Sequence, residues 1–197
     1  EKMGEMGHVQ WPCPTLDHPG TPYLYSDNQF DTPTGKGQLF AAPWRAPAET
    51  PDTDYPLVLC TVREVGHYSC RSMTGNCAAL QSLADEPGRV QMNPADADER
   101  GIADGQLVWV RSRRGKVITR ASISERINAG AIYMTYQWWI GACNELTQDN
   151  LDPISRTPET KYCAVQMEAI EDQRWAEDFA ASAYQTMKTR LIAAVNV

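Results

Sequence analysis

The sequence has no pair of cysteines at a metal-binding or redox spacing. Its six cysteines are scattered without a C-x-x-C pair, which is the usual ligand spacing of structural zinc sites. Several of them lie in apolar runs that are typical of strands. The pattern predicts free thiols in a reducing compartment, so we expect a cytoplasmic protein whose own residues bind no metal. The cysteines are Cys13, Cys60, Cys70, Cys77, Cys143 and Cys163.

Long apolar runs and an excess of positive charge are also absent. No stretch approaches the roughly 18 apolar residues that a membrane-spanning helix needs, and no basic segment leads into an apolar one at the start. The net charge of -7 argues against a broad nucleic-acid surface. The one dense basic run, Arg111 to Lys116, is interpreted as a solvated hairpin turn. We therefore expect neither membrane insertion nor a nucleic-acid partner.

Residues 1–54 hold most of the thirteen prolines and show no sustained helical period. Extended segments joined by turns are predicted there, with Gly35 and Gly37 relaxing the backbone at a hairpin. We interpret this region as a Pro-rich arm that needs another surface to become ordered. The chain also begins at Glu1 rather than Met, which indicates a piece of a longer protein. The aromatic residues that could anchor the arm are Trp11, Tyr23, Tyr25, Phe30 and Trp44.

Residues 55–168 show short strand patterns separated by turns, without the alternation of strand and helix that marks a parallel sheet. This mainly β pattern with short helices predicts a closed barrel. One short helix is expected at 76–84. Another is expected at 93–101, where Asn93 can cap, Pro94 suits the first position and Gly101 ends the helix. Asp104-Gly105 and Arg114-Gly115 are hairpin signals. The six predicted strands are 57–61, 89–92, 107–112, 116–124, 131–136 and 162–167.

The region 169–197 has a different period. Apolar residues recur every fourth position between charged and small residues, which predicts an amphipathic helix from 171 to 194. The apolar stripe should dock on the barrel or on a neighbouring domain. Its members are Trp175, Phe179, Ala183, Met187 and Leu191.

The most polar loop follows the first predicted strand. Residues 62–76, V-R-E-V-G-H-Y-S-C-R-S-M-T-G-N, place cations, a carboxylate, an imidazole and hydroxyls at one strand end. Binding sites are often built on such loops because a rigid strand positions them. The loop predicts a site for a polar, anionic ligand.

Several ordered blocks resemble the C-terminal, molybdopterin-dinucleotide-binding domain of the large molybdopterin oxidoreductases. N-P-A-D-A and D-P-I-S-R-T-P are general to that family. E-V-G-H-Y-S-C and Y-Q-W-W-I-G-A-C are most similar to formate dehydrogenase catalytic subunits. The resemblance also covers V-Q-W-P-C-P and F-D-T-P-T-G-K-G-Q-L-F, and so extends over nearly the whole chain.

The resemblance implies a six-stranded double-psi β-barrel that binds bis-molybdopterin guanine dinucleotide carrying molybdenum or tungsten. It also implies a missing N-terminal region with an iron-sulfur cluster, a selenocysteine or cysteine metal ligand, and an adjacent His and Arg. The partners would be the remaining domains of the same subunit and electron-transfer subunits, with formate as the substrate. This fragment alone should hold no catalytic residue and be inactive.

Four cofactor-binding residues are expected in the loop after the first strand. Arg63 can present a bidentate fork to a phosphate or a ring carbonyl, and Glu64 can accept a hydrogen bond from a pterin amine. His67 and Ser69 can add single directional bonds. From the residues alone, Arg63 and Glu64 could equally form a surface ion pair.

Four further residues come from two later blocks. Tyr136 resembles a cofactor-contacting tyrosine, Gln137 could bond the pterin, and Asn144 matches the family's N-x-L-T position. Lys161 matches a family lysine near the pterin, although Thr160 replaces the usual aromatic residue before it and leaves a stacking contact in doubt. Without the resemblance, Asn144 is equally well read as a turn residue. Trp138 and Trp139 are expected in core or interdomain packing.

The leading hypothesis is the cofactor-binding fragment of a molybdenum formate dehydrogenase that oxidises formate to carbon dioxide. A second hypothesis keeps the fold but changes the substrate to nitrate or a sulfur oxyanion. A third is a free-standing double-psi barrel that binds a protein partner. The residue that ligates the metal, upstream of this sequence, would separate the first two hypotheses. Affinity for a pterin dinucleotide would separate both from the third.

Overall fold

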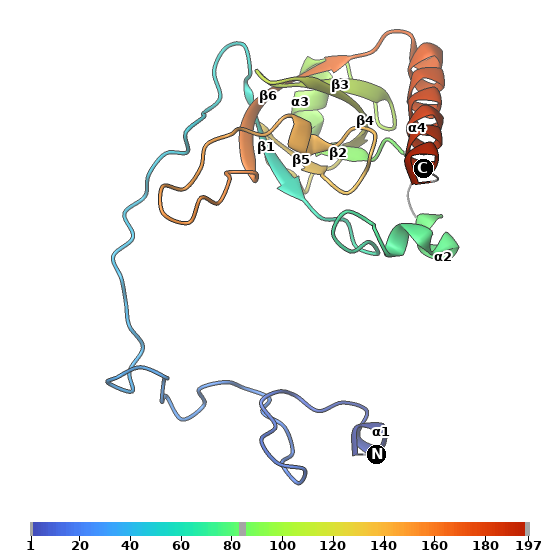
Figure 1. The fold of residues 1–197 in the computed structure, drawn as a ribbon. Helices are drawn as coiled ribbons and strands as arrows, with labels where there is room; N and C mark the ends of the chain where they lie inside the picture. Colours follow the sequence, from blue (N-terminus) through green and yellow to red (C-terminus); the bar gives the residue numbers. More distant parts are fainter. Residues whose placement is uncertain (1, 83–85, 196–197) are drawn as a thin grey trace. The chain divides into compact units, whose positions relative to one another are not determined.

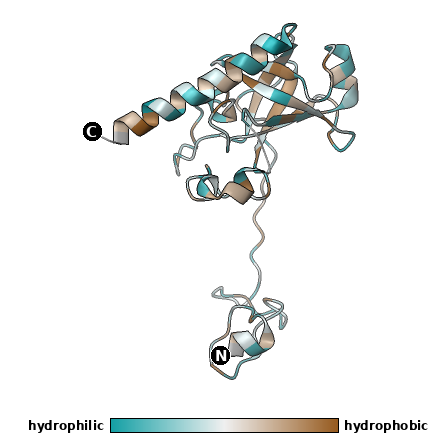
Figure 2. Cartoon of the chain, turned by 90° about the vertical axis from the view of Figure 1, so that its right-hand side faces the viewer, coloured by the Kyte–Doolittle hydropathy of each residue, from teal (hydrophilic) through white to brown (hydrophobic). Residues whose placement is uncertain are grey.

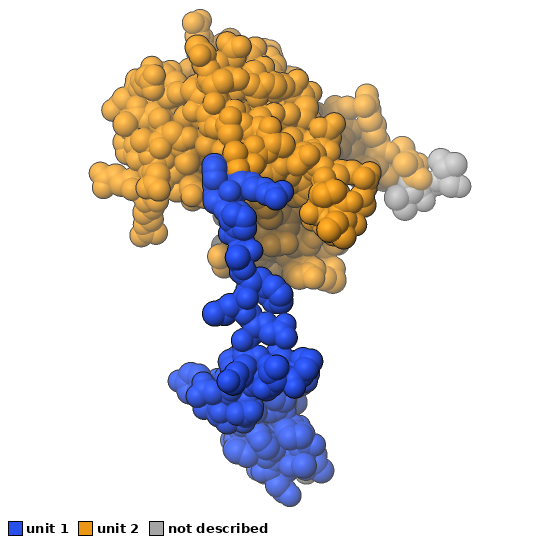
Figure 3. Space-filling view, turned by 90° about the vertical axis from the view of Figure 1, so that its left-hand side faces the viewer, with its two compact units in different colours: residues 1–45 blue, residues 46–197 orange. Residues whose placement is uncertain are grey.

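The computed structural model describes residues 2–82 and 86–195. These residues form two compact units, 1–45 and 46–197, which Figure 3 colours separately. The segment 46–54, which the sequence groups with the arm, belongs to the second unit. Its polar side chains bind the barrel, as described below.

Six strands of the second unit close into a barrel (Figure 1). Their order around the barrel is β1-β5-β2-β4-β3-β6, with β1 parallel to β5, β2 parallel to β4, and the other four pairs antiparallel. The mainly β, double-psi prediction is confirmed. The strands are β1 (Leu57–Val62), β2 (Arg89–Met92), β3 (Leu107–Arg111), β4 (Lys116–Ile123), β5 (Ala131–Thr135) and β6 (Tyr162–Ala169).

The barrel interior is filled by the alternate residues of these strands. In β1 every second side chain, beginning at Leu57, is buried, which is the period of a strand with one face in a core. Leu59, Val90 and Ile132 are fully buried there. Figure 2 shows the apolar strands gathered inside the barrel. The interior is therefore a packed core, and polar sites are left to the loops and the outer face.

The short helices agree partly with expectation. Helix α3 (Pro94–Glu99) begins as predicted, because the Asn93 side chain accepts a hydrogen bond from the Ala95 amide and Pro94 takes the first position. The helix expected at 76–84 is instead a 3-10 turn, η1 (Thr74–Asn76), followed by α2 (Ala78–Gln81). Part of that expected helix, residues 83–84, lies outside the described residues. A second 3-10 turn, η2 (Cys143–Glu145), follows β5.

Helix α4 (Gln173–Val195) confirms the C-terminal helix, and it docks on the barrel through two residues of the expected stripe, Trp175 and Phe179, together with alanines outside that stripe. Ala176 and Ala180 are its buried side chains and pack against Leu107 and Ile118 of the barrel. Small side chains allow this close approach. Trp175 and Phe179 stay about two-fifths exposed beside Trp109, and Leu191 is half exposed. None of the described helices has a stretch long and apolar enough to cross a membrane.

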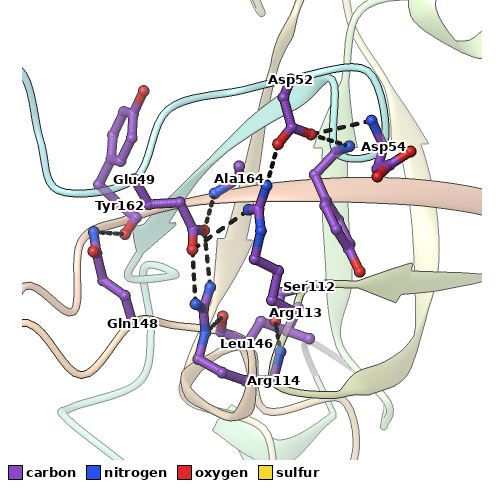
Figure 4. A network of polar contacts seen from close by, with 11 residues as sticks. Glu49, Asp52, Asp54, Ser112, Arg113, Arg114, Leu146, Gln148, Tyr162 and Ala164 are labelled. Carbon is purple, nitrogen blue, oxygen red and sulfur yellow. Dashed lines mark hydrogen bonds and ion pairs between the residues drawn. The ribbon is translucent and has the colours of Figure 1, made fainter.

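The turn between β3 and β4 confirms one hairpin signal and corrects the interpretation of the basic run. Ser112 donates its amide to the Gly115 carbonyl, which closes the hairpin. The Asp104-Gly105 signal was wrong as a hairpin, because the preceding strand β2 pairs with β4 and β5 and not with β3. The basic residues of the turn are not merely solvated. They bind carboxylates of the segment 46–54 (Figure 4).

We call these residues, Glu49, Asp52, Arg113 and Arg114, the Glu49 junction. Both oxygens of Glu49 accept from the Arg114 guanidinium, at 2.7 and 2.9 Å, and one also accepts from the Ala164 amide of β6 at 2.7 Å. Arg113 bonds Asp52. The hydrogen bond from Arg114 lowers the pKa of Glu49 despite partial burial. The junction ties the segment before β1 to the barrel.

The first unit contains turns and a five-residue helix, α1 (Lys2–Met6), that the sequence did not indicate. Phe30 donates its amide to Gly35 at the expected turn, but no strands form there. Tyr25 and Phe30 stack with ring centroids 5.0 Å apart. Trp11 and Trp44 are more than three-quarters exposed. The arm therefore presents its aromatic residues outward, as a segment that needs another surface would.

Candidate cofactor-binding site

Three of the expected residues meet at the carboxyl ends of β1 and β5. Arg63 donates from Nε to the Tyr136 hydroxyl at 2.8 Å, and its guanidinium lies 5.6 Å from the tyrosine ring. The Lys161 ammonium lies 5.7 Å from the same ring. The parallel register that pairs Val62 with Thr135 brings the first two together. Two cations and a phenol from three distant segments thus form one cationic cluster.

Gln137 has a supporting role in this structure. It is fully buried, and its side-chain amide donates to the His67 carbonyl at 2.9 Å while its oxygen accepts from the Glu64 amide and the Thr135 hydroxyl. Both ends of the side chain are thus bonded inside the protein, and one of the two N–H donors of the amide is used by the His67 carbonyl. Gln137 therefore fixes the loop after β1 to the end of β5.

Glu64 is half-buried at the inner side of this loop. Its carboxylate accepts from the indole nitrogen of Trp138 at 3.1 Å. Burial raises the pKa of Glu64, and the Trp138 hydrogen bond and nearby positive charges oppose that rise. An ionised carboxylate in this position can accept a hydrogen bond from an amine.

His67 is buried, and only one of its ring nitrogens is used within the described part of the chain. Nδ1 lies 3.0 Å from the Thr74 hydroxyl, whereas the buried Nε2 has no partner. The ring meets Trp138 edge to face at 5.4 Å. Buried polar atoms are almost always paired. The unpaired nitrogen is therefore the atom of this loop best prepared to bond something from outside the chain.

The remaining expected residues have fewer contacts. Ser69 is half-buried with a positive φ of 47° and no side-chain hydrogen bond among the described residues. Asn144 is exposed on η2, and no described hydrogen bond joins it to the other seven expected residues. The structure thus places Arg63 and Lys161 each against the ring of Tyr136 and joins Glu64 and His67 through Gln137. Ser69 and Asn144 are linked to none of these by a described hydrogen bond.

Sequence reasoning missed the residue that holds the two loops together. Arg71 is 2% exposed, and its Nε donates to the Gln137 carbonyl at 2.6 Å. Its guanidinium lies 4.0 Å from the Trp138 ring and pairs with Glu86, whose carboxylate also accepts from the Ile140 amide at 3.0 Å. We call Arg71, Glu86, Gln137 and Trp138 the Arg71 junction. The two tryptophans after Gln137 were the sequence signal that could have indicated a nearby arginine, because a guanidinium group stacks favourably on aromatic rings.

Close packing against Trp138 also depends on a glycine. A Cβ on Gly88 would lie 2.1 Å from Cδ1 of Trp138, and Gly88 has a positive φ of 80°. No other residue fits there without displacing the indole. The prediction that Trp138 packs in the core is confirmed, since it is 1% exposed, whereas Trp139 is 40% exposed beside Tyr184 of α4.

The two buried cysteines, Cys143 and Cys163, carry unreactive thiols. All six are free, as expected. Burial raises the pKa of the Cys143 thiol to about 12 and that of Cys163 to about 11. Both therefore stay protonated at neutral pH, and protonated thiols are poor metal ligands and nucleophiles. Among the described residues no group of three potential ligands is placed to hold a metal ion.

Comparison with known proteins adds the family. The molydopterin dinucleotide binding domain matches residues 57–164. Formate dehydrogenase H of Escherichia coli is 62% identical over 97% of the chain, which covers 27% of that protein. An F420-dependent formate dehydrogenase subunit alpha of Methanocaldococcus jannaschii is 40% identical over 82% of the chain, which covers 24% of it.

Other matches extend beyond formate dehydrogenases. The periplasmic nitrate reductase of Desulfovibrio desulfuricans is 32% identical over 85% of the chain, which covers 24% of it. The solved structure of acetylene hydratase from Pelobacter acetylenicus matches 73% of this chain and 25% of its own with a TM-score of 0.56, and at 18% identity it shows the fold alone. The chain spans about a quarter of the length of the curated relatives it matches.

Proposed function

Because the chain belongs to the molydopterin dinucleotide binding domain family, we propose that it is the cofactor-binding C-terminal part of a formate dehydrogenase catalytic subunit. Its identity to formate dehydrogenase H is nearly twice its identity to the nitrate reductases, which supports formate as the substrate of the whole protein. The whole protein would convert formate to carbon dioxide, with loss of two electrons and one proton.

The cationic cluster of Arg63, Tyr136 and Lys161 is the observation that carries this proposal. A pterin dinucleotide presents phosphate oxygens, ring carbonyls and ring amines. The guanidinium and ammonium suit the phosphates and carbonyls, and the Glu64 carboxylate suits an amine. The unpaired, buried Nε2 of His67 is a group that a bound ligand would satisfy. The donor set therefore fits bis-molybdopterin guanine dinucleotide.

When bound, that group supplies the redox centre, as molybdenum or tungsten, and this chain supplies binding and orientation. Arg63 and Lys161 would hold anionic or carbonyl oxygens, Tyr136 would keep both cations in place, and Glu64 and His67 would each bond the cofactor. Gln137 would act through the loop that it fixes. Ser69 and Asn144 remain proposed contacts from the edges of the site.

The finer parts of the proposal concern the rest of the subunit. We propose that it carries an iron-sulfur cluster and a selenocysteine or cysteine metal ligand, and that electron-transfer subunits receive the electrons. The cytoplasm is the proposed location, which the six free thiols support. Reading the upstream coding sequence for an N-terminal cysteine cluster and an in-frame selenocysteine codon tests these points. A nitrate reductase is the second candidate, because one relative of that function is 32% identical to the chain. The metal ligand encoded upstream would also distinguish this candidate from a formate dehydrogenase.

The test of the function uses the full-length protein. Elemental analysis should find molybdenum or tungsten, and formate should drive reduction of an artificial electron acceptor, whereas nitrate should not be reduced. A purified full-length protein that contains neither metal, although it comes from cells that make the cofactor, would end the proposal. A metal-containing protein that reduces nitrate but does not oxidise formate would instead support the nitrate reductase as the function.

Arg63→Ala tests the site itself. The change removes the charged donor from the cluster and should lower the pterin and metal content of the full-length protein several-fold, since a hydrogen bond from a charged group contributes about 1.5–3 kcal/mol. Arg63 is exposed, so the fold should persist. Arg174→Ala, at an exposed position of α4, is the matched control. Unchanged pterin content and activity in Arg63→Ala would remove Arg63 from the site.

A further inference from the structure

Trp138 is a buried tryptophan whose polar atom bonds a residue of the candidate cofactor site. The side chain is 1% exposed, and its indole nitrogen donates to a carboxylate oxygen, Oε2 of Glu64, at 3.1 Å. Buried tryptophans usually bond their single N–H donor. The acceptor here is ionisable, and it lines an open cleft of about 640 Å³ together with Arg63 and His67. This hydrogen bond therefore links the packed core to the site.

The direction of the indole N–H is fixed by the groups around the ring. The Arg71 guanidinium lies 4.0 Å from the ring centroid, and the His67 ring meets the indole edge to face at 5.4 Å. The backbone of Gly88 approaches so closely that a Cβ there would lie 2.1 Å from Cδ1 of the indole. The ring therefore cannot turn its N–H away from Glu64 without displacing a neighbour.

Glu64 is held at both of its ends by the two consecutive residues Gln137 and Trp138. Its backbone amide donates to the Gln137 side-chain oxygen, and its carboxylate accepts from Trp138. Within the described residues no hydrogen bond reaches the second carboxylate oxygen, Oε1. One oxygen is thus bonded inside the protein, and the other is left for a donor from outside.

The same hydrogen bond affects the charge of Glu64. Burial raises the pKa of this carboxyl group, and the bond from Trp138 opposes that rise, as do the nearby Arg89, His67 and Arg71. A protonated carboxyl group carries a donor on one oxygen, whereas the ionised group accepts on both. The indole N–H therefore favours the form of Glu64 that can accept a hydrogen bond from an amine.

We propose that Trp138 is a positioning residue for the cofactor, and that its indole N–H holds the Glu64 carboxylate ionised with Oε1 free to accept from an amine of the pterin. The inference rests on the proposed function, which supplies that amine. Trp138 itself is too deeply buried to touch the cofactor, so it acts through Glu64.

A purely structural role of Trp138 makes a different prediction. If the indole only fills space beside Gly88 and Arg71, loss of its N–H should change the stability of the site equally at every pH. If the indole acts through Glu64, the loss should change the pH dependence of the site, and only while residue 64 can ionise. The pH dependence therefore separates the two roles.

The experiment uses the full-length subunit, purified from cells that make the pterin cofactor and from cells that cannot. Trp138→Phe removes the N–H and keeps an aromatic ring, and Glu64→Gln removes the titrating group. The two changes are also combined. Trp139→Phe is the matched control, because Trp139 is the next residue and also lies beside Arg71, at 5.0 Å, but its indole has no hydrogen bond to Glu64 in the described structure. Urea unfolding verifies that each variant is folded.

Two quantities are measured over a series of pH values. The first is the pterin that each loaded variant retains after washing, quantified by pterin fluorescence. The second is the ionisation of Glu64 in cofactor-free protein, followed by infrared spectroscopy with carboxyl-labelled glutamate. Subtracting the spectrum of Glu64→Gln isolates this carboxyl group from the others.

Trp138→Phe should hold the pterin roughly tenfold more weakly near the midpoint of the wild-type pH profile, because a hydrogen bond to a charged group is lost. The carboxylate is the accepting form above its pKa, so a less opposed effect of burial moves the loss of pterin to higher pH. The infrared midpoint of Glu64 should move in the same direction. Trp139→Phe should move neither midpoint, and in Glu64→Gln the further change Trp138→Phe should leave the pH profile unchanged.

A second variant keeps the shape of the indole, in case Trp138→Phe does not fold. Biosynthetic replacement of tryptophan by 5-fluorotryptophan makes each indole N–H a stronger donor, because fluorine withdraws electron density. The infrared midpoint of Glu64 should then move to lower pH. The same replacement in Trp138→Phe, if that variant folds, should have no such effect.

Two results would overturn the proposal. One is an infrared midpoint of Glu64 that neither Trp138→Phe nor fluorotryptophan moves. The other is a loss of pterin on Trp138→Phe that is equal at all pH values and equally large in Glu64→Gln. A subunit that never contains pterin would refute the proposed function, and the infrared titration would show separately whether Trp138 controls the ionisation of Glu64.

Discussion

Two arginine-centred junctions hold the loops of the barrel unit, and they differ in their exposure to water. At the Arg71 junction the paired side chains of Arg71 and Glu86 are 1% and 7% exposed. At the Glu49 junction the side chains of Arg114 and Glu49 are 27% and 13% exposed. The first joins the two loops of the candidate cofactor site, and the second ties the segment before β1 to the barrel.

The difference in exposure gives the two arginine–carboxylate pairs different structural roles. A buried ion pair loses its water, so each partner depends on the other and on the surrounding hydrogen bonds, and the geometry is fixed. A partly exposed pair can exchange its partner for water at small cost. We infer that the Arg71 junction sets the shape of the candidate cofactor site. The Glu49 junction only holds the segment 46–54 against the barrel. Three variants test this difference, in decreasing order of expected effect.

Arg71→Met should cause the largest loss. It leaves the Glu86 carboxylate buried without its partner and removes the cation stacked on Trp138, and breaking a buried pair costs about 3–5 kcal/mol. Urea unfolding of the 197-residue chain measures the loss. Arg111→Met, which removes a surface pair with Glu168, is the control and should cost at most about 1 kcal/mol. Similar losses in both variants would mean that burial of the pair is unimportant.

Gly88→Ala should have the next largest effect. The new methyl group would meet the indole of Trp138, and an alanine at a positive φ is itself strained, so we expect a loss of about 2–4 kcal/mol. Gly101→Ala is the matched control, because Gly101 also has a positive φ of 62° but nothing lies within 4 Å of its Cβ position. It should cost only about 1–2 kcal/mol. Equal losses would show that contact with Trp138 does not matter.

Glu49→Gln should have the smallest effect, about 1–2 kcal/mol at neutral pH. The amide keeps its shape and can still accept one hydrogen bond, but the charge-assisted pair with Arg114 is lost. Urea unfolding of the same chain provides the measurement. A loss as large as that of Arg71→Met would contradict the distinction between the two junctions.

The Glu49 effect should also depend on pH. The Arg114 hydrogen bond lowers the folded-state pKa of Glu49 below 4.5, so its stabilisation is complete above the unfolded-state value and is lost as the pH falls through the lowered folded-state value. The free energies of unfolding of the wild type and of Glu49→Gln should therefore converge as the pH falls through the lowered folded-state pKa of Glu49. A difference that stays constant over this range would argue that Glu49 is not ionised in the folded protein.

The sequence was sufficient to predict much of the fold. Short strand patterns between turn signals located all six strands, and the Asn93-Pro94 pair located the start of α3, because these signals are local. The hairpin at Asp104-Gly105 was wrong because a turn signal does not say which strands pair. Trp175 and Phe179 of the predicted stripe do contact the barrel, but the buried part of the α4 interface was missed, since alanines at positions 176 and 180 carry no strong hydrophobic signal.

Some features of the candidate site were also predictable from the sequence, and others were not. The blocks that resemble one family indicated Arg63, Tyr136 and Lys161 as cofactor-binding residues, but the contact of Arg63 with Tyr136 depends on the register of β1 beside β5. Gln137 is predicted as a ligand of the pterin, and the structure adds that its side chain is buried and bonded to the His67 carbonyl, which no local sequence signal indicates. Arg71 and Glu86 gave no sequence signal as a pair, since fifteen residues separate them.

By itself, the sequence determined which elements form and which residue types stand at their ends, because strand period, caps and turns depend on neighbours along the chain. Only the tertiary structure decided which charges are paired. Arg71 and Arg114 form ion pairs with carboxylates, whereas Arg126 forms none among the described residues. The physical reason is that pairing and burial depend on distances across the barrel, which closure of the six strands sets.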